Sequence, residues 1–401
     1  MVSKSTATAF RAASRPPSAR ARAGWLTAAA VVLVAFNLRL GISSAAALLD
    51  ALRTGLGFGD GVAALLPTLP ALCFAAAGAG TGALARRLGA ERTVLLAVAA
   101  LAAGLGIRAV PAIWALLAGT VLGMSGLALC NVLLPTLVRA HFPGRIALVT
   151  GAYTTALSLG AAFASAAAVP VAGALGSPSL GLAVWALPAA VAAVVWASVR
   201  PPRPPAVVGP ACTLSPWAMA RTRLGALVTA YFGLQALNAY AVTGWLPSLL
   251  SGQGMSEGAA GGVLAVAQAV GVPVSYAVLA AARDPRRLRA TFAAVSLAML
   301  AGFGGLLVAP VALPLVWAVL VGAGLCSFPL VLTVIAGSGG SAAETTALST
   351  LSQSAGYLLA ALGPLAVGLL HGATGGWGAP MAVLVGTAAA QLAVGMALTR
   401  R

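Results

Sequence analysis

Twelve apolar segments of about 20 residues or more constrain the fold of this 401-residue chain more than any other feature. Their approximate bounds are 25–49, 61–84, 93–110, 112–138, 146–175, 180–199, 224–250, 259–282, 290–308, 314–337, 345–370 and 379–398. A helix needs about 20 apolar residues to cross the hydrocarbon core of a bilayer. Backbone groups in lipid must be hydrogen-bonded within a helix or a closed barrel. The sequence therefore predicts an all-α membrane protein with 12 transmembrane helices.

The composition supports a membrane protein and argues against nucleic-acid binding. Charged residues make up 7% of the chain, whereas a soluble domain has about 25%. The net charge of +17 is strongly positive. However, no basic patch alternates with aromatic residues that could stack on bases. We therefore expect the lipid bilayer as a partner and no nucleic acid.

The basic residues lie almost entirely on one side of the predicted membrane. Of the 23 lysines and arginines, all but Arg39, Arg53 and Arg108 fall in the N-terminal tail, in alternate connections or at the C-terminus. Lysine and arginine favour cytoplasmic loops. We predict that both termini are cytoplasmic and that the protein is a multi-pass protein of the cytoplasmic (inner) cell membrane.

The connections divide the chain into a tail, two groups of six spans and a linker. Residues 1–24 are basic and lack acids, which resembles a transit peptide, but we favour a disordered cytoplasmic tail. Residues 25–199 and 224–401 form the predicted N-terminal and C-terminal six-helix bundles. Residues 200–223 form a cytoplasmic linker containing RPPRPP, in which the prolines prevent a continuous helix.

The two groups of spans are related in sequence. A shift of 197 residues places GFGDGVAA (57–64) over GMSEGAAG (254–261) and Arg86 over Arg283. A repeated six-helix unit is typical of a carrier whose halves move about a central site. A channel or a receptor would not require such a repeat.

Arg39 lies near the middle of the first span, within FNLRLGISS. A central arginine costs on the order of 2.5–3.5 kcal/mol on insertion scales. Each acid of the chain lies near the end of a span, and Asp50 is expected to pair with Arg53, so Arg39 has no carboxylate partner. Either backbone carbonyls, Asn37 and serines bind Arg39 as a structural centre, or Arg39 faces a cavity and its counter-ion is a solute.

Amide and hydroxyl groups in other spans could surround the same solute. Such groups commonly hydrogen-bond helices to one another in lipid. Together around one cation, they also suit a small polar or anionic solute. The candidate solute-binding residues are Arg39, Asn37, Asn131, Tyr153, Thr154, Gln235, Asn238, Gln268, Gln353 and Tyr357.

The sequence contains no pattern typical of catalysis or metal binding. The four cysteines have no CxxC spacing, so neither a zinc site nor a disulfide framework is supported. The only histidines are His141 and His371, and neither H-E-x-x-H nor G-x-S-x-G occurs. We therefore expect no enzymatic activity, no cofactor and no metal.

Several segments together resemble the cyanate and 2-nitroimidazole transporter family of the major facilitator superfamily. They are FNLRLGISS, LPTLPALCFA, LARRLGAER, GLALCNVLLPTLV, GAYTTALSLGAA, FGLQALNAYAVTGWLP and LSQSAGYLLAALGPL. The resemblance extends from about residue 25 to residue 398. It implies the major facilitator fold, alternating access and a central site that the spans carrying Arg39, Asn131, Gln235 and Gln353 help to line. We also expect a monomer.

The loop between the second and third spans departs from the superfamily's usual G-x-L-x-D-R-x-G-R-R pattern. In GALARRLGAER, Arg86 stands where the acid belongs and Glu91 where a basic residue is common. The usual acidic latch at that position is therefore missing. The candidate gating-loop residues are Gly82, Arg86, Arg87, Gly89 and Arg92.

These features predict a secondary active transporter for a small anionic or weakly acidic, cyanate-like solute. The alternative is efflux of neutral drug-like molecules such as nitroimidazoles, in which case Arg39 is structural. If transport is coupled to protons, the coupling should not depend on a carboxylate inside a span, since none is expected there.

Overall fold

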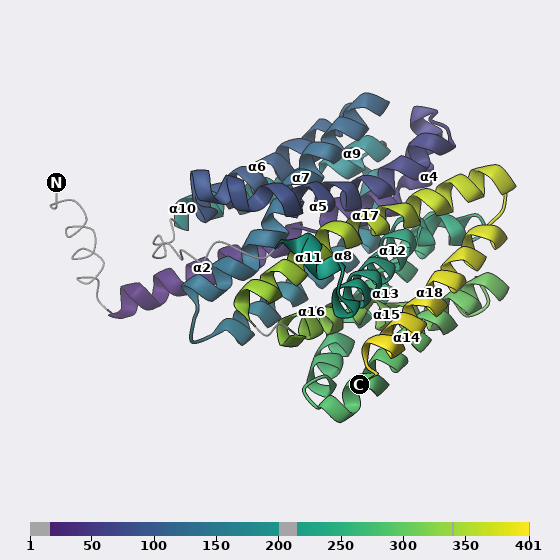
Figure 1. Ribbon diagram of the computed structural model, residues 1–401. Coiled ribbons are helices and arrows are strands. Elements are labelled where there is room, and N and C mark those ends of the chain that lie inside the picture. Colours follow the sequence, from purple (N-terminus) through teal and green to yellow (C-terminus); the bar gives the residue numbers. More distant parts are fainter. Residues whose placement is uncertain (1–16, 200–214, 339–340, 401) are drawn as a thin grey trace.

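The computed structural model describes residues 17–199, 215–338 and 341–400, and within these ranges the chain forms helices joined by short connections (Figure 1). The first half contains α2 Pro17–Asn37, α3 Leu40–Ala47, α4 Leu49–Leu56, α5 Asp60–Leu88, α6 Ala90–Ile107, α7 Ile113–His141, α8 Ile146–Ala174, α9 Pro178–Ala183 and α10 Ala186–Val199. The second half contains α11 Pro216–Ala220, α12 Arg223–Ser251, α13 Glu257–Ala281, α14 Pro285–Val308, α15 Pro314–Leu325, α16 Ser327–Ser338, α17 Ala342–Thr374 and α18 Gly378–Leu398. The predicted all-α membrane fold is confirmed.

Eleven segments of the described chain are long and apolar enough to cross a membrane. The remaining predicted span corresponds to α12, which has 29 residues and is therefore long enough. This span includes the polar residues Gln235, Asn238 and Tyr240. Each of the twelve predicted spans thus coincides with one helix or with two consecutive helices.

The ends of the predicted domains differ slightly from the helix bounds. Helix α2 begins at Pro17, within the tail predicted to be disordered. Proline is well tolerated in the first turn of a helix, and the alanines and arginines that follow are good helix formers. Residues 1–16 of the predicted tail and residues 200–214 of the predicted linker lie outside the described residues. The described end of the linker contains the short helix α11.

Three predicted spans are interrupted helices rather than continuous ones. The first breaks at residues 38–39 between α2 and α3, the sixth at residues 184–185, and the tenth at Cys326. No glycine or proline lies at the first break. There the Asn37 side chain donates to the Leu33 carbonyl at 2.8 Å. A side chain that bonds the carbonyl four residues earlier competes with the helical backbone ladder and bends the helix.

The two halves lie side by side, from purple to blue and from teal to yellow in Figure 1. Helix α5 of the first half packs against α17 of the second, and α8 packs against α13. The buried apolar core is shared between the halves, since Phe74 and Tyr357 belong to the same buried cluster.

Polar contacts join the halves at the end predicted to face outside, which we call the outer end. Asp50 of α4 accepts hydrogen bonds from Ser248 and Ser251 of α12 at 2.9 and 2.8 Å. The expected Asp50–Arg53 pair is not formed, because Arg53 instead pairs with Asp60 at 2.5 Å. Asp50 therefore contributes to a contact between the halves, which we call the outer seal.

Candidate functional site

Arg39 lies at the break in the first span. Helix α2 ends at Asn37, and α3 begins at Leu40. The Ser43 amide donates a hydrogen bond to the Arg39 carbonyl at 3.1 Å. The Arg39 side chain is half-buried. Among the described residues it has no hydrogen-bond or ion-pair partner. Interrupted helices are typical of the binding sites of secondary transporters.

An aromatic cluster from both halves lies within electrostatic range of Arg39. The Tyr357 ring stacks on Phe74 with the ring centroids 5.0 Å apart, and Tyr240 lies 6.3 Å from both rings. The Arg39 guanidinium interacts electrostatically with the hydroxyls of Tyr240 and Tyr357. The arrangement thus combines one cation, two phenolic hydroxyls and aromatic faces. It can offer charge-assisted hydrogen bonds and stacking to a small planar solute.

Asn37 lies beside the same break and carries an unused acceptor. Its side chain is completely buried, and its Oδ1 atom has no hydrogen-bond partner among the described residues. Leaving a buried polar atom unpaired costs about 1–3 kcal/mol. Asn37 Oδ1 is therefore a buried acceptor beside the break whose hydrogen-bonding capacity the described chain does not use.

Three candidate amides have donors or acceptors that the described chain does not use: Asn131, Gln235 and Gln353. The half-buried Asn131 and the buried Gln235 make no side-chain hydrogen bond within the described chain. The Gln353 amide donates only to Ser349 of its own helix, at 2.8 Å. None of the three is hydrogen-bonded to Arg39, so a shared solute would have to bring these groups together.

The Asn238 amide is already occupied within the second half. Its nitrogen donates to Gln391 at 2.9 Å, and its oxygen accepts from Thr387 at 2.7 Å. Gln391 in turn donates to Ser327, next to the break in the tenth span. Both ends of the Asn238 amide bind α18, so its evident role is to hold helices together.

Gln268 connects the two halves near the outer end. Its amide nitrogen donates to Ser43 of α3 at 2.8 Å and also lies 3.4 Å from the Ser165 hydroxyl of α8. The backbone of α13 also packs tightly against α8, because a Cβ added to Gly261 would lie 2.5 Å from the Ser165 carbonyl oxygen. Gln268 thus makes a second polar contact between the halves, separate from the outer seal at Asp50.

The two candidate residues on α8 have different surroundings. Tyr153 is half-buried and packs against the main apolar cluster. Thr154 is exposed, and its hydroxyl donates to the carbonyls of Thr150 and Gly151 in its own helix. Its neighbour Thr155 lies 3.1 Å from the Tyr276 hydroxyl of the other half.

Every acid in the chain lies at the N-cap or in the first turn of a helix. They are Asp50, Asp60, Glu91, Glu257, Asp284 and Glu344. Carboxylates are stabilised there by the positive end of the helix dipole. The side chains of Ser256 and Ser341 accept the expected capping hydrogen bonds from Ala259 and Glu344. No carboxylate is therefore positioned inside a span to neutralise Arg39.

The predicted gating loop joins α5 to α6 through a tight turn. Gly89 has a φ of +86°, a conformation that glycine adopts most readily. Gly82, Arg86, Arg87 and Arg92 are exposed, and none of these arginines has an ion pair within the described chain. Glu91 lies 3.7 Å from His141 of α7 instead.

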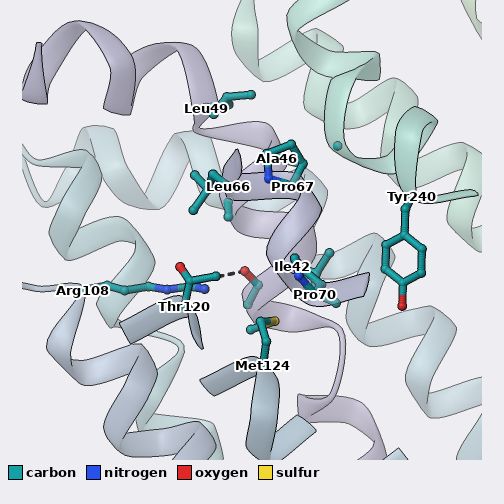
Figure 2. A pocket seen from close by; sticks show the side chains of 13 residues that line it. Ile42, Ala46, Leu49, Leu66, Pro67, Pro70, Arg108, Thr120, Met124 and Tyr240 are labelled. Atoms are coloured by element: carbon teal, nitrogen blue, oxygen red, sulfur yellow. Dashed lines mark hydrogen bonds between the residues drawn. The ribbon is translucent and has the colours of Figure 1, made fainter. Parts of the chain in front are cut away.

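One arginine of the described chain has a fully buried side chain. Arg108 lies in the connection after α6, as expected from the sequence, but its side chain is only 1% exposed. Its Nη1 donates to the Gly41 carbonyl of α3 at 3.0 Å, beside a small, partly enclosed cavity (Figure 2). Its position inside the apolar run 93–110 was the available signal.

Sequence reasoning also left Phe74 out of the site and Tyr240 out of the candidate set. Phe74 carried no signal, because an apolar residue within a span has no distinguishing pattern. Tyr240 does carry one, since it is a polar aromatic residue on the same span as Gln235.

Comparisons with known proteins agree with this architecture. Residues 31–364 match the family model of the Major Facilitator Superfamily. The chain is 35% identical over 358 residues to the 2-nitroimidazole transporter of Escherichia coli (strain K12), a match covering 88% of this chain and 90% of that protein. It is 28% identical to the cyanate transport protein CynX of the same organism, covering 86% and 90% of the two chains.

Solved structures show the same fold at low sequence identity. The nucleoside transporter NupG aligns with a TM-score of 0.74 at 13% identity, covering 94% of this chain and 99% of that one. A bacterial homologue of the human lysosomal transporter Spinster aligns with a TM-score of 0.76 at 14% identity, covering 96% and 98%. The chain therefore belongs to the major facilitator superfamily and is a multi-pass membrane transporter of small-molecule solutes. Within the superfamily it belongs with the 2-nitroimidazole and cyanate transporters.

Proposed function

We propose that the protein is a secondary active transporter for a small anionic or weakly acidic solute, with Arg39 as the counter-ion of that solute. The observation that carries this proposal is the half-buried Arg39 guanidinium without a hydrogen-bond or ion-pair partner in the described chain. An unpaired charge within a membrane is costly and usually marks a functional site. An anionic solute would supply the missing negative charge.

The surrounding groups support a small, planar ligand. Tyr240 and Tyr357 interact with Arg39 and carry hydroxyls, and Asn37 offers an unpaired acceptor oxygen. A relative named as a cyanate transport protein fits this solute class. We place the protein in the cytoplasmic membrane as a monomer, with both termini inside and the two halves alternating around Arg39.

The coupling mechanism follows from where the acids lie. All six acids are at helix starts, so proton coupling, if it occurs, does not use a carboxylate inside a span.

Export of neutral drug-like molecules is the second candidate function. The aromatic rings of Phe74, Tyr240 and Tyr357 favour it, because stacking does not require a charged ligand. So does a relative named as a 2-nitroimidazole transporter. In this case Arg39 would be structural and would not contact the solute.

Solute uptake by reconstituted vesicles tests the role of Arg39. Charge-assisted hydrogen bonds contribute about 1.5–3 kcal/mol, so Arg39→Gln should weaken the apparent affinity for cyanate by about 10- to 150-fold. Arg39→Lys should be affected less, because it keeps the charge but loses the planar fork. Arg287→Gln is the matched control, because Arg287 is exposed and pairs with Asp284.

The amount of each variant in the membrane must be measured alongside uptake. If Arg39→Gln reaches the membrane in normal amount and takes up cyanate with unchanged affinity, Arg39 is not the counter-ion. If the wild type transports no anion and Arg39→Gln transports neutral 2-nitroimidazole normally, the neutral-solute function is supported instead.

A further inference from the structure

Arg108 is a buried cation with unused hydrogen-bonding capacity. It directly follows the last residue of α6 and is among the largest fully buried side chains. One of its terminal nitrogens donates to the Gly41 carbonyl at 3.0 Å, whereas its Nε is buried without a partner in the described chain. None of the ion pairs of the described residues includes Arg108. A fully buried charge without a counter-ion is strongly unfavourable.

The packing of α6 against α7 directs this side chain toward the first span. A Cβ on Gly119 of α7 would lie 2.5 Å from the Gly104 carbonyl oxygen and 3.0 Å from Cγ of Arg108. Glycine at 119 therefore allows the Arg108 stem to pass between the two helices. The guanidinium then reaches α3, as Figure 2 shows.

The Arg108 guanidinium borders a partly enclosed cavity of about 20 Å³. One water molecule needs a cavity of about 10–15 Å³, so this cavity has room for a small particle. Its other walls come from α3, α4, α5, α7 and α12 and are mostly apolar. The hydroxyl of Thr120 is already bonded to the Leu116 carbonyl at 2.6 Å.

The cavity lies between the Arg39 site and the outer seal. Gly41 and Ile42 line it and belong to the first turn of α3 after the break at Arg39. Tyr240 lines it as well and interacts with Arg39. On the other side the cavity touches Leu49, which precedes Asp50 of the outer seal.

We propose that Arg108 and this cavity form a second anion-binding site, which takes one small monovalent inorganic anion of about the size of chloride. The anion supplies the missing counter-charge and accepts hydrogen bonds from the guanidinium. The role of this site as an intermediate binding site between Arg39 and the outer end rests on the proposed function. Anion binding at Arg108 is independent of the proposed function.

The test compares thermal unfolding of the purified full chain in sodium chloride and in sodium gluconate at equal ionic strength. Gluconate is too large for the cavity, so chloride alone should raise the unfolding midpoint by binding the folded state. Arg108→Gln should increase the chloride concentration for half-maximal stabilisation by about 10-fold or more. Arg53→Gln removes an outer arginine paired with Asp60 and should leave the chloride effect unchanged.

A second variant decides the question if Arg108→Gln does not fold. Ala46 lines the cavity, so Ala46→Val fills the cavity with two methyl groups and keeps Arg108. It should also abolish chloride stabilisation. An unchanged chloride effect in either Arg108→Gln or Ala46→Val would overturn the second site.

Arg39→Gln separates this proposal from the proposed function. Chloride stabilisation should persist in Arg39→Gln, because the cavity is intact. If it is lost in Arg39→Gln and kept in Arg108→Gln, chloride binds only at Arg39, and the second site is wrong while the proposed function stands. Unchanged solute affinity in Arg39→Gln would refute the proposed function. It would not change the conclusion about chloride binding at Arg108.

Discussion

At the scale of single residues, two completely buried asparagines have opposite hydrogen-bonding situations. Asn37 has an acceptor oxygen without a partner in the described chain, next to the break in the first span. Asn238 uses both its nitrogen and its oxygen in contacts with Gln391 and Thr387. Sequence alone could not separate them, because both are asparagines in apolar spans and their difference depends on which helices face them.

Replacing each asparagine with leucine should therefore separate function from stability. Asn37→Leu removes an unpaired acceptor together with the Asn37–Leu33 hydrogen bond, at little change in size. The two effects oppose each other, so the unfolding temperature should change little, while solute affinity falls. Asn238→Leu leaves Gln391 and Thr387 unpaired and should destabilise the protein by about 1–3 kcal/mol. Thermal unfolding in detergent and the concentration dependence of uptake measure the two effects.

One outcome of this comparison would contradict the prediction. If Asn37→Leu lowers the unfolding temperature as much as Asn238→Leu and leaves solute affinity unchanged, Asn37 is a structural residue. The neutral-solute function would then gain support, since one polar group beside Arg39 would have no part in binding.

At the scale of helices, the apolar runs predicted the spans well but not the interruptions within them. The length and position of α8 agree with the predicted run 146–175 to within one residue at either end, because apolar length directly determines membrane crossing. The break at residues 38–39 was missed, since no glycine or proline marks it in the sequence. The Asn37–Leu33 hydrogen bond beside it depends on a rotamer, which the sequence does not specify.

The residues of the candidate site were also predicted only in part from the sequence. Arg39 stood out in sequence because charge is rare in an apolar run, and Tyr357 was found because it is polar. The stacking of Phe74 on Tyr357 joins residues of different halves, and that juxtaposition depends on how α5 packs against α17. Arg108 follows the end of α6, as expected, but the contact of its long side chain with Gly41 depends on how the helices pack.

Two adjacent glycines on α13 allow a test of helix packing at the outer end. A Cβ at Gly261 would lie 2.5 Å from the Ser165 backbone oxygen of α8, whereas a Cβ at Gly262 meets nothing within 4 Å. Gly261→Ala should therefore push α13 away from α8 at a cost of about 1–3 kcal/mol. Gly262→Ala is the matched control and should be neutral or stabilising, since alanine is the better helix former.

Distances between spin labels on the two halves measure this displacement. Thr54 and Gln253 are exposed on either side of the outer end and can carry the labels once the four native cysteines are replaced. We expect Gly261→Ala to populate a longer distance and Gly262→Ala to retain the wild-type distribution. Identical distributions in both variants would show that α13 and α8 do not control closure.

At the scale of the whole molecule, the described conformation is closed at the outer end by contacts between the halves. Asp50, Ser248 and Ser251 form one such contact, and Gln268, Ser43 and Ser165 form another. A carrier that works by alternating access must break these contacts when the outer end opens. Their strength therefore helps to set the equilibrium between the two states.

Removing the Asp50 carboxylate should shift this equilibrium toward the outward-open state. Hydrogen bonds to a charged group contribute about 1.5–3 kcal/mol, so Asp50→Ala should change the population ratio by about 10- to 150-fold. The control is Asp284→Ala, which removes the cap of α14 at a cost of about 1 kcal/mol without touching the outer seal. In spin-label measurements between Thr54 and Gln253, only Asp50→Ala should increase the long-distance population.

Because solute binding at Arg39 would still be intact, Asp50→Ala should also bind solute from the outside yet release it slowly inside. An Asp50→Ala protein with the wild-type distance distribution would show that the serine–aspartate contact does not hold the outer end closed.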